Sequence, residues 1–193
     1  MLRKHLFLLV IVLVLGGCMF PVPVPSLDTQ YPDEWPELIN TKNIETDIES
    51  SYVCFGEGKK EGRDINGRFN LWRGYAICQI LEVKKTETGL LFNYILNGKS
   101  IVTQEYLLGQ DYKVAGSWIK FKAQKIPTVD NNPNRNVEVS LTLNETGELV
   151  VKQIFETSEL DGGLVAVIPV VVMKVDWDYR WGRYVQATEE SLE

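Results

Sequence analysis

Apolar and polar residues alternate with a period of two over most of the chain from residue 50 onward. In residues 137–144, valine and leucine alternate with glutamate, serine, threonine and asparagine, and in residues 118–123 tryptophan and lysine alternate with apolar side chains. Alternation of this kind is typical of strands that bury one face. The same pattern predicts further strands at residues 50–56, 66–70, 75–84, 90–96, 100–108, 111–116, 148–157 and 164–176.

Short turn sequences that contain glycine separate these predicted strands. Asn97-Gly98 and the segments 86–89, 144–147 and 161–163 supply residues that tolerate a positive φ. Because no long helical pattern lies between the strands, parallel βαβ architecture is disfavoured. The sequence therefore predicts an all-β fold, an antiparallel meander of about eight to ten strands that forms a barrel or a barrel-like sandwich.

Two stretches are predicted to lie outside the strands. Residues 34–40 suggest a short helical piece, and Trp35 is expected to pin this acidic segment to the domain. The glycine-rich stretch from Gly56 to Arg63 has neither the spacing of a phosphate loop nor that of a dinucleotide fingerprint. It is predicted to be a solvated loop, and the alternative is that, together with Arg68 and Arg73, it contacts anionic headgroups or a phosphate-bearing ligand.

Residues Leu164 to Val175 are apolar at nearly every position, with Pro169 in the middle. A strand that is apolar on both faces should be covered on both, and the proline indicates a bulge or an edge position. The outer face either packs on residues 27–49 or is a docking patch, and we expect internal cover, since large exposed apolar patches are uncommon on soluble domains. The aromatic segment from Asp176 to Tyr184 is then expected to close the domain.

The N-terminus has the layout of an export signal. Basic residues precede an apolar run from Leu6 to Leu15, which is too short to span a bilayer, and Gly16-Gly17-Cys18 follows. This ending resembles the lipobox of bacterial membrane lipoproteins, which implies that Cys18 carries acyl chains such as palmitate and becomes the first mature residue. Two or more chains hold a protein on a membrane stably. Met19 stands where an aspartate would retain such a lipoprotein at the inner membrane, so the resemblance implies an outer-membrane location facing the periplasm.

These features divide the chain into four parts. Residues 1–17 are the signal peptide, and residues 18–49 contain the lipidated cysteine, a proline-rich tether and an N-terminal segment. Residues 50–185 form the β-rich domain, and residues 186–193 form a C-terminal tail.

Charge and histidine content narrow the function classes. Because Arg3 and Lys4 leave with the leader, the net charge falls from −6 by two further units, which disfavours nucleic-acid binding. The only histidine, His5, also leaves, so the mature chain has neither a Ser-His-Asp triad nor a histidine zinc site. We therefore expect a protein that is not an enzyme and needs no metal or other cofactor.

Two cysteines, Cys54 and Cys78, remain once Cys18 is acylated. In an oxidising compartment a pair of cysteines suggests one disulfide. The alternative is two separate buried thiols, since cysteine is among the most buried residue types.

Candidate ligand contacts come from Trp177, Tyr179 and Trp181, which have Arg180 and Arg183 between and after them. Such a cluster suits a cation–π binding surface. The alternative is an aromatic plug at the end of a barrel.

Two weaker resemblances concern the mature domain. Residues 64–69 resemble the opening Gly-x-aromatic of lipocalin-type barrels, which implies a calyx for a small ligand and a late arginine over the aromatic, here Arg180 or Arg183. Tyr52-Val53-Cys54 is similar to the early Tyr-x-Cys of membrane-bound lysozyme-inhibitor lipoproteins. We expect non-catalytic binding of a small apolar ligand or of an envelope partner, with inhibition of a secreted enzyme such as lysozyme as the alternative. An apolar cavity in the interior would distinguish the calyx from a partner-binding protein with a filled core.

Overall fold

The computed structural model describes residues 30–60, 63–69, 78–125, 135–165 and 168–188, with only the backbone for residues 63–68, 135, 158–165 and 168–177. The predicted signal peptide, Cys18 and the proline-rich tether lie outside the described residues, as does most of the C-terminal tail. No helix among the described residues is long and apolar enough to cross a membrane.

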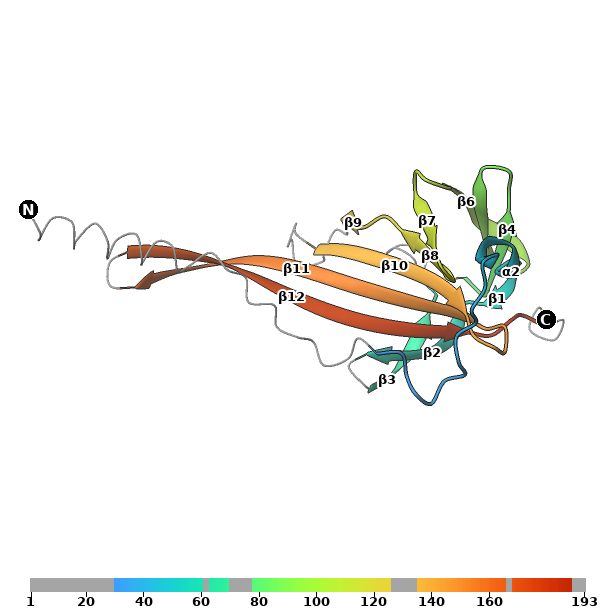
Figure 1. Cartoon of the computed structure of the whole chain (residues 1–193), viewed down its shortest axis with the longest axis horizontal. Coiled ribbons are helices and arrows are strands. Elements are labelled where there is room, and N and C mark those ends of the chain that lie inside the picture. Colours follow the sequence, from blue (N-terminus) through green and yellow to red (C-terminus); the bar gives the residue numbers. More distant parts are fainter. Residues whose placement is uncertain (1–29, 61–62, 70–77, 126–134, 166–167, 189–193) are drawn as a thin grey trace, which may run out of the picture.

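Two antiparallel sheets make up the fold (Figure 1). The four-stranded sheet has the order β1 (Ser50–Val53), β4 (Ile80–Lys85), β5 (Gly89–Leu96) and β6 (Lys99–Leu107). The eight-stranded sheet has the order β3 (Arg63–Arg68), β2 (Phe55–Lys60), β12 (Ile168–Tyr184), β11 (Leu149–Val165), β10 (Arg135–Leu143), β8 (Trp118–Phe121) and β7 (Tyr112–Ala115), with β9 (Gln124–Lys125) also paired to β10. The all-β prediction is confirmed in its sandwich form, because the sheets do not close into a barrel.

The core lies between the two sheets and is filled by large side chains. The predicted alternation along β10 is confirmed, since Val137, Val139 and Leu141 are fully buried in this core. Aromatic residues form a large part of the rest of the core, and several pairs meet edge to face, such as Phe92 with Tyr106 and Phe69 with Tyr184. Members of this buried set include Tyr52, Phe69, Phe92, Tyr94, Tyr106, Tyr112, Phe121 and Tyr184.

The predicted disulfide is present. Cys54 and Cys78 are bonded with their Cα atoms 5.8 Å apart, within the range that a disulfide requires. Cys54 lies where the chain passes from β1 in one sheet to β2 in the other. The bridge therefore fastens the crossing between the sheets, and the alternative of two separate thiols is wrong.

Strands β11 and β12 form a ribbon of 17 residues on each side, which extends well beyond the sandwich in Figure 1. The pairing runs without interruption from Leu149↔Tyr184 to Val165↔Ile168. The prediction of a turn at residues 161–163 is wrong, because Gly162 and Gly163 lie within β11. They pair with Val171 and Val170, and the β-branched valines favour a continuous ladder over a turn.

The N-terminal segment differs from the predicted helix. Residues 34–40 are not helical, and the helix is α2 (Ile44–Asp47). Pro36 interrupts any regular helix before it, and the segment instead pairs with the end of β10, where the Ile39 N–H donates to the Leu143 carbonyl at 3.0 Å. Trp35 is 5% exposed, so the expectation that it pins this segment to the domain is confirmed.

The predicted loop from Gly56 to Arg63 is also wrong, since residues 55–60 form β2 and pair with both β12 and β3. Glycine allows this close pairing. A Cβ atom at Gly56 would lie 2.0 Å from the carbonyl oxygen of Arg183 on β12. The glycines read as loop residues therefore serve a close contact between neighbouring strands.

Candidate functional site

A groove of about 460 Å³ lies on the face of the eight-stranded sheet that points away from the core. Apart from Phe121, which is also a core residue, the lining residues on β8, β10 and β11 alternate with core residues such as Ile119, Leu141 and Val151, which places the two sets on opposite faces. The volume is in the range of small-ligand sites. The lining residues are Lys113, Trp118, Lys120, Phe121, Glu138, Ser140, Lys152, Ile154 and Trp181.

Strand register places five of these residues in one transverse row. Lys113 pairs with Lys120, and Lys120 pairs with Ser140 on the next strand. Ser140 then pairs with Lys152, which pairs with Trp181. Since directly opposed residues of antiparallel strands share a face, three lysines, a hydroxyl and an indole follow one another across five strands.

Positive charge in this row is not neutralised within the protein. Lys113, Lys120 and Lys152 form no ion pair with any carboxylate of the described residues. Burial lowers the pKa of Lys152 from its ordinary value, and the charge of Lys120 lowers this pKa further. One carboxylate, that of the exposed Glu138, also lines the groove. The groove thus has an excess of positive charge in an acidic chain.

Aromatic side chains hold Lys152 in the groove. Its Nζ lies 5.0 Å from the ring centroid of Trp181 and 5.8 Å from that of Tyr179. Both distances suit a cation–π contact. The ammonium group is therefore fixed over a rigid platform rather than free to extend into solvent.

Trp181 belongs to a small aromatic cluster beneath the segment of residues 31–38. It is 7% exposed and packs against Trp118 at 6.2 Å and Tyr31 at 5.4 Å between ring centroids, and Trp35 joins the same cluster. The Nε1 group of Trp181 is buried and has no hydrogen-bond partner in the described structure. An unmade bond of this kind costs about 1–3 kcal/mol.

Sequence reasoning found part of this site. Tyr179 and Trp181 lie together beside Lys152, whereas Trp177 is placed only by its backbone pairing with Glu156, and its side chain lies outside the described residues. The two arginines lie over rings outside the predicted cluster, and Arg183 is 5.2 Å from the ring centroid of Trp35. Arg180 lies over Phe155 at 4.5 Å on the other face.

The groove residues that sequence reasoning missed are Lys113, Trp118, Lys120 and Lys152. The alternation in residues 118–123 did place Trp118 and Lys120 on the polar face of a strand. What brings the lysines together is the pairing of β7, β8, β10 and β11, and hydropathy alone does not reveal that register.

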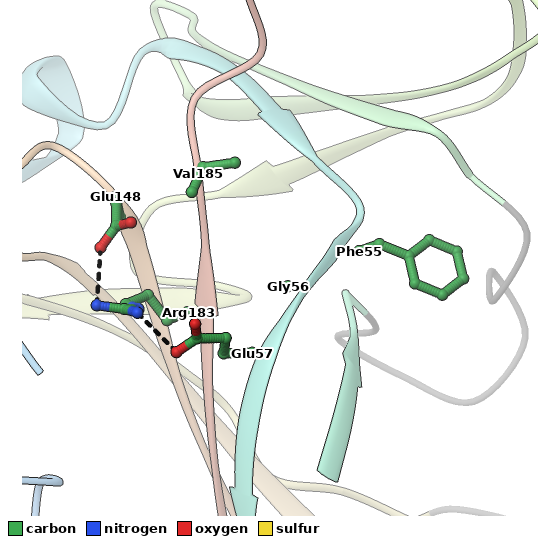
Figure 2. Close-up of a pocket in the computed structure, with 6 residues that line it drawn as sticks. All are labelled: Phe55, Gly56, Glu57, Glu148, Arg183 and Val185. Atoms are coloured by element: carbon green, nitrogen blue, oxygen red, sulfur yellow. Dashed lines mark hydrogen bonds and ion pairs between the residues drawn. The ribbon is translucent and has the colours of Figure 1, made fainter. Parts of the chain in front are cut away.

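A second pocket, of about 250 Å³, lies at the end of β12 (Figure 2). There Arg183 lies between two carboxylates, bonded to Glu57 at 2.6 Å and paired with Glu148 at 3.5 Å. The ring of Phe55 points away from these ion pairs and is 51% exposed. Because two carboxylates outweigh the one arginine of its lining, this pocket has no positive charge left for an anionic ligand.

Comparison with known protein families, with curated proteins and with solved structures found no match.

Proposed function

We propose that this chain is a lipid-anchored, non-catalytic binding protein of the bacterial envelope that recognises its partner at the groove on the eight-stranded sheet. One observation carries the proposal: a cavity of ligand size with unneutralised lysines lies on the outer face of a sandwich whose core is filled. Attachment through acylated Cys18 would hold this face near the membrane surface.

The filled core favours a surface partner over an apolar ligand in the interior. Tyr52, Phe92 and Tyr94 are fully buried in the space that a calyx would leave open. A calyx ligand would also need an apolar lining, whereas the groove combines three lysines with aromatic surface. Recognition of a polar or charged group fits this lining better.

The proposal can be tested by photo-crosslinking in intact bacteria. A photoreactive phenylalanine analogue is placed at Lys113, which is exposed at the groove, and in a matched control at Lys99, which is exposed on β6 of the other sheet. We expect a discrete adduct from position 113 and none from position 99. Equal adducts from both positions, or none from position 113, would contradict the proposal.

A further inference from the structure

We propose that the groove is a phosphate-binding site, which takes a ligand carrying two linked phosphoryl groups across the row of Lys113, Lys120, Ser140 and Lys152. This inference rests on the proposed function, because it names the ligand class of the same groove. The type of cation, the spacing of the lysines and their mutual repulsion support this inference.

The cations are all lysines. Arginine binds both carboxylate and phosphate through its two-pronged guanidinium, and lysine binds phosphate as a compact point charge. Arg180 and Arg183, the arginines next to Trp181 on β12, are engaged with Asp178 and with Glu57. A phosphoryl group offers several oxygens at tetrahedral angles, which suits ammonium groups that approach from different strands.

The spacing in the row suits two phosphoryl groups. Lys120 and Lys152 both pair with Ser140, so they flank it from the neighbouring strands, about 10 Å apart at the backbone. One phosphoryl group above Ser140 would receive a hydroxyl hydrogen bond and contact both ammonium groups. A second group, about 7 Å further along the row, would lie between Lys113 and Lys120, which are direct cross-strand partners.

The lysines of the groove repel one another. Like charges directly opposed across a ladder destabilise a sheet, and Lys113 and Lys120 stand in that relation. Lys152 is held over Trp181 and Tyr179, so it cannot leave the row without losing these contacts. The burial and like charge that lower the pKa of Lys152 would both be offset by a bound dianion. Local arrangements that lower stability, such as these opposed lysines, concentrate at functional sites.

The indole ring of Trp181 lines the far end of the row, beside Lys152. Its Nε1 group is closed to water and forms no hydrogen bond with the described residues, so a ligand above Ser140 would lie near the ring without bonding this group.

The test is a calorimetric titration of the detergent-solubilised full chain with inorganic tripolyphosphate. We expect saturable binding that is weakened about tenfold or more in Lys120→Gln and Lys152→Gln. Lys99→Gln on β6 is the control, because it makes the same change in net charge away from the groove. Thermal unfolding verifies that each variant is folded. Absence of binding by the wild type, or equal binding by the control and the groove variants, would overturn the proposal.

Two further arms identify the source of the phosphate. The chain is reconstituted in phosphatidylcholine vesicles with or without phosphatidylglycerol, and tripolyphosphate binding is measured again. Competition by phosphatidylglycerol points to a lipid headgroup, and unchanged binding points to a soluble phosphorylated ligand; both results support the site. If the crosslink from position 113 persists although tripolyphosphate does not bind, the ligand class is wrong while the proposed function stands.

Discussion

The ammonium group of Lys152 lies over the indole ring of Trp181, 5.0 Å from its centroid, at a position where the two residues are direct cross-strand partners. The contact fixes a cation on the outer face of the sheet, and Trp181 is fixed in turn by the aromatic rings of Tyr31 and Trp118. Through this pair, the packing of the N-terminal segment on Trp181 helps to position the positive charge of Lys152 in the groove.

Replacement of Lys120 tests whether the row of lysines lowers the free energy of unfolding. Lys120→Gln should raise the free energy of unfolding by about 0.2–1 kcal/mol, because it removes like-charge repulsion with both Lys113 and Lys152. Thermal or chemical unfolding measures the change, with Lys99→Gln as the control. A clear loss of stability in Lys120→Gln would show that the side chain has a structural role that the groove does not explain.

Truncation of Trp181 should destabilise the domain strongly. Trp181→Ala removes a buried ring from a cluster that also contains Trp35, and we expect a loss of about 3–5 kcal/mol in chemical denaturation. Trp181→Phe should cost much less, because the Nε1 group that it deletes has no partner in the described structure. Equal destabilisation of the two variants would indicate that the Trp181 Nε1–H group forms a hydrogen bond that the described structure does not contain.

The disulfide should contribute substantially to stability. Cys54 and Cys78 are 24 residues apart, and closing a loop of this size stabilises a chain by about 3.5 kcal/mol in the chain-entropy model. The double variant Cys54→Ala/Cys78→Ala should lower the unfolding midpoint accordingly. Reductant should lower the midpoint of the wild type and leave that of the variant unchanged. A reductant-insensitive wild type would refute this prediction.

Alkaline pH should unfold the protein through its buried tyrosines. Burial is the main cause that raises the pKa of Tyr31 from 10.0 to about 12, and burial also raises the pKa of Tyr52 and Tyr184. Because these folded-state values lie above the unfolded value, stability is complete below about pH 10 and falls as the pH rises through the folded-state values. Tyr31→Phe should reduce the loss between pH 10 and 12. Identical pH profiles for Tyr31→Phe and the wild type would contradict this.

Acylation of Cys18 is the prediction on which the proposed location depends. Intact-mass spectrometry of membrane-extracted protein should show a chain that begins at Cys18 and carries fatty acyl groups. Cys18→Ala should release the protein from the membrane fraction or leave its signal peptide uncleaved. An unmodified Cys18 on mature, membrane-extracted protein would contradict the predicted lipid anchor.

The alternation of apolar and polar residues was sufficient to predict most of the strands and the core-facing side of β10. It predicted the buried valines and leucines of β10, and the count of cysteines predicted the disulfide. Two glycine-rich stretches were misread as turn and loop, because glycine within a strand has the same local signal as glycine in a turn. Only the pairing of Gly56 against β12 shows that it serves close strand contact.

The site was less predictable because it depends on register. Lys113, Lys120 and Lys152 are far apart in sequence, and each one alone looks like an ordinary solvated position on a half-buried strand. Their alignment arises from pairings between β7, β8, β10 and β11, which a shift of one residue would destroy. Tyr179 and Trp181 were predicted as ligand contacts because aromatic residues at alternate positions of one short segment are visible in the sequence alone.

The most direct test of the phosphate site is the Trp181 indole signal in a ¹H–¹⁵N NMR spectrum of the detergent-solubilised full chain. The signal is assigned as the one that disappears in Trp181→Phe, and it is followed during titration with inorganic tripolyphosphate. We predict a saturable shift of the Trp181 Nε1–H signal. This ligand-induced shift should be smaller in Lys152→Gln and unchanged in Lys99→Gln. A Trp181 signal that stays fixed throughout the titration would contradict it.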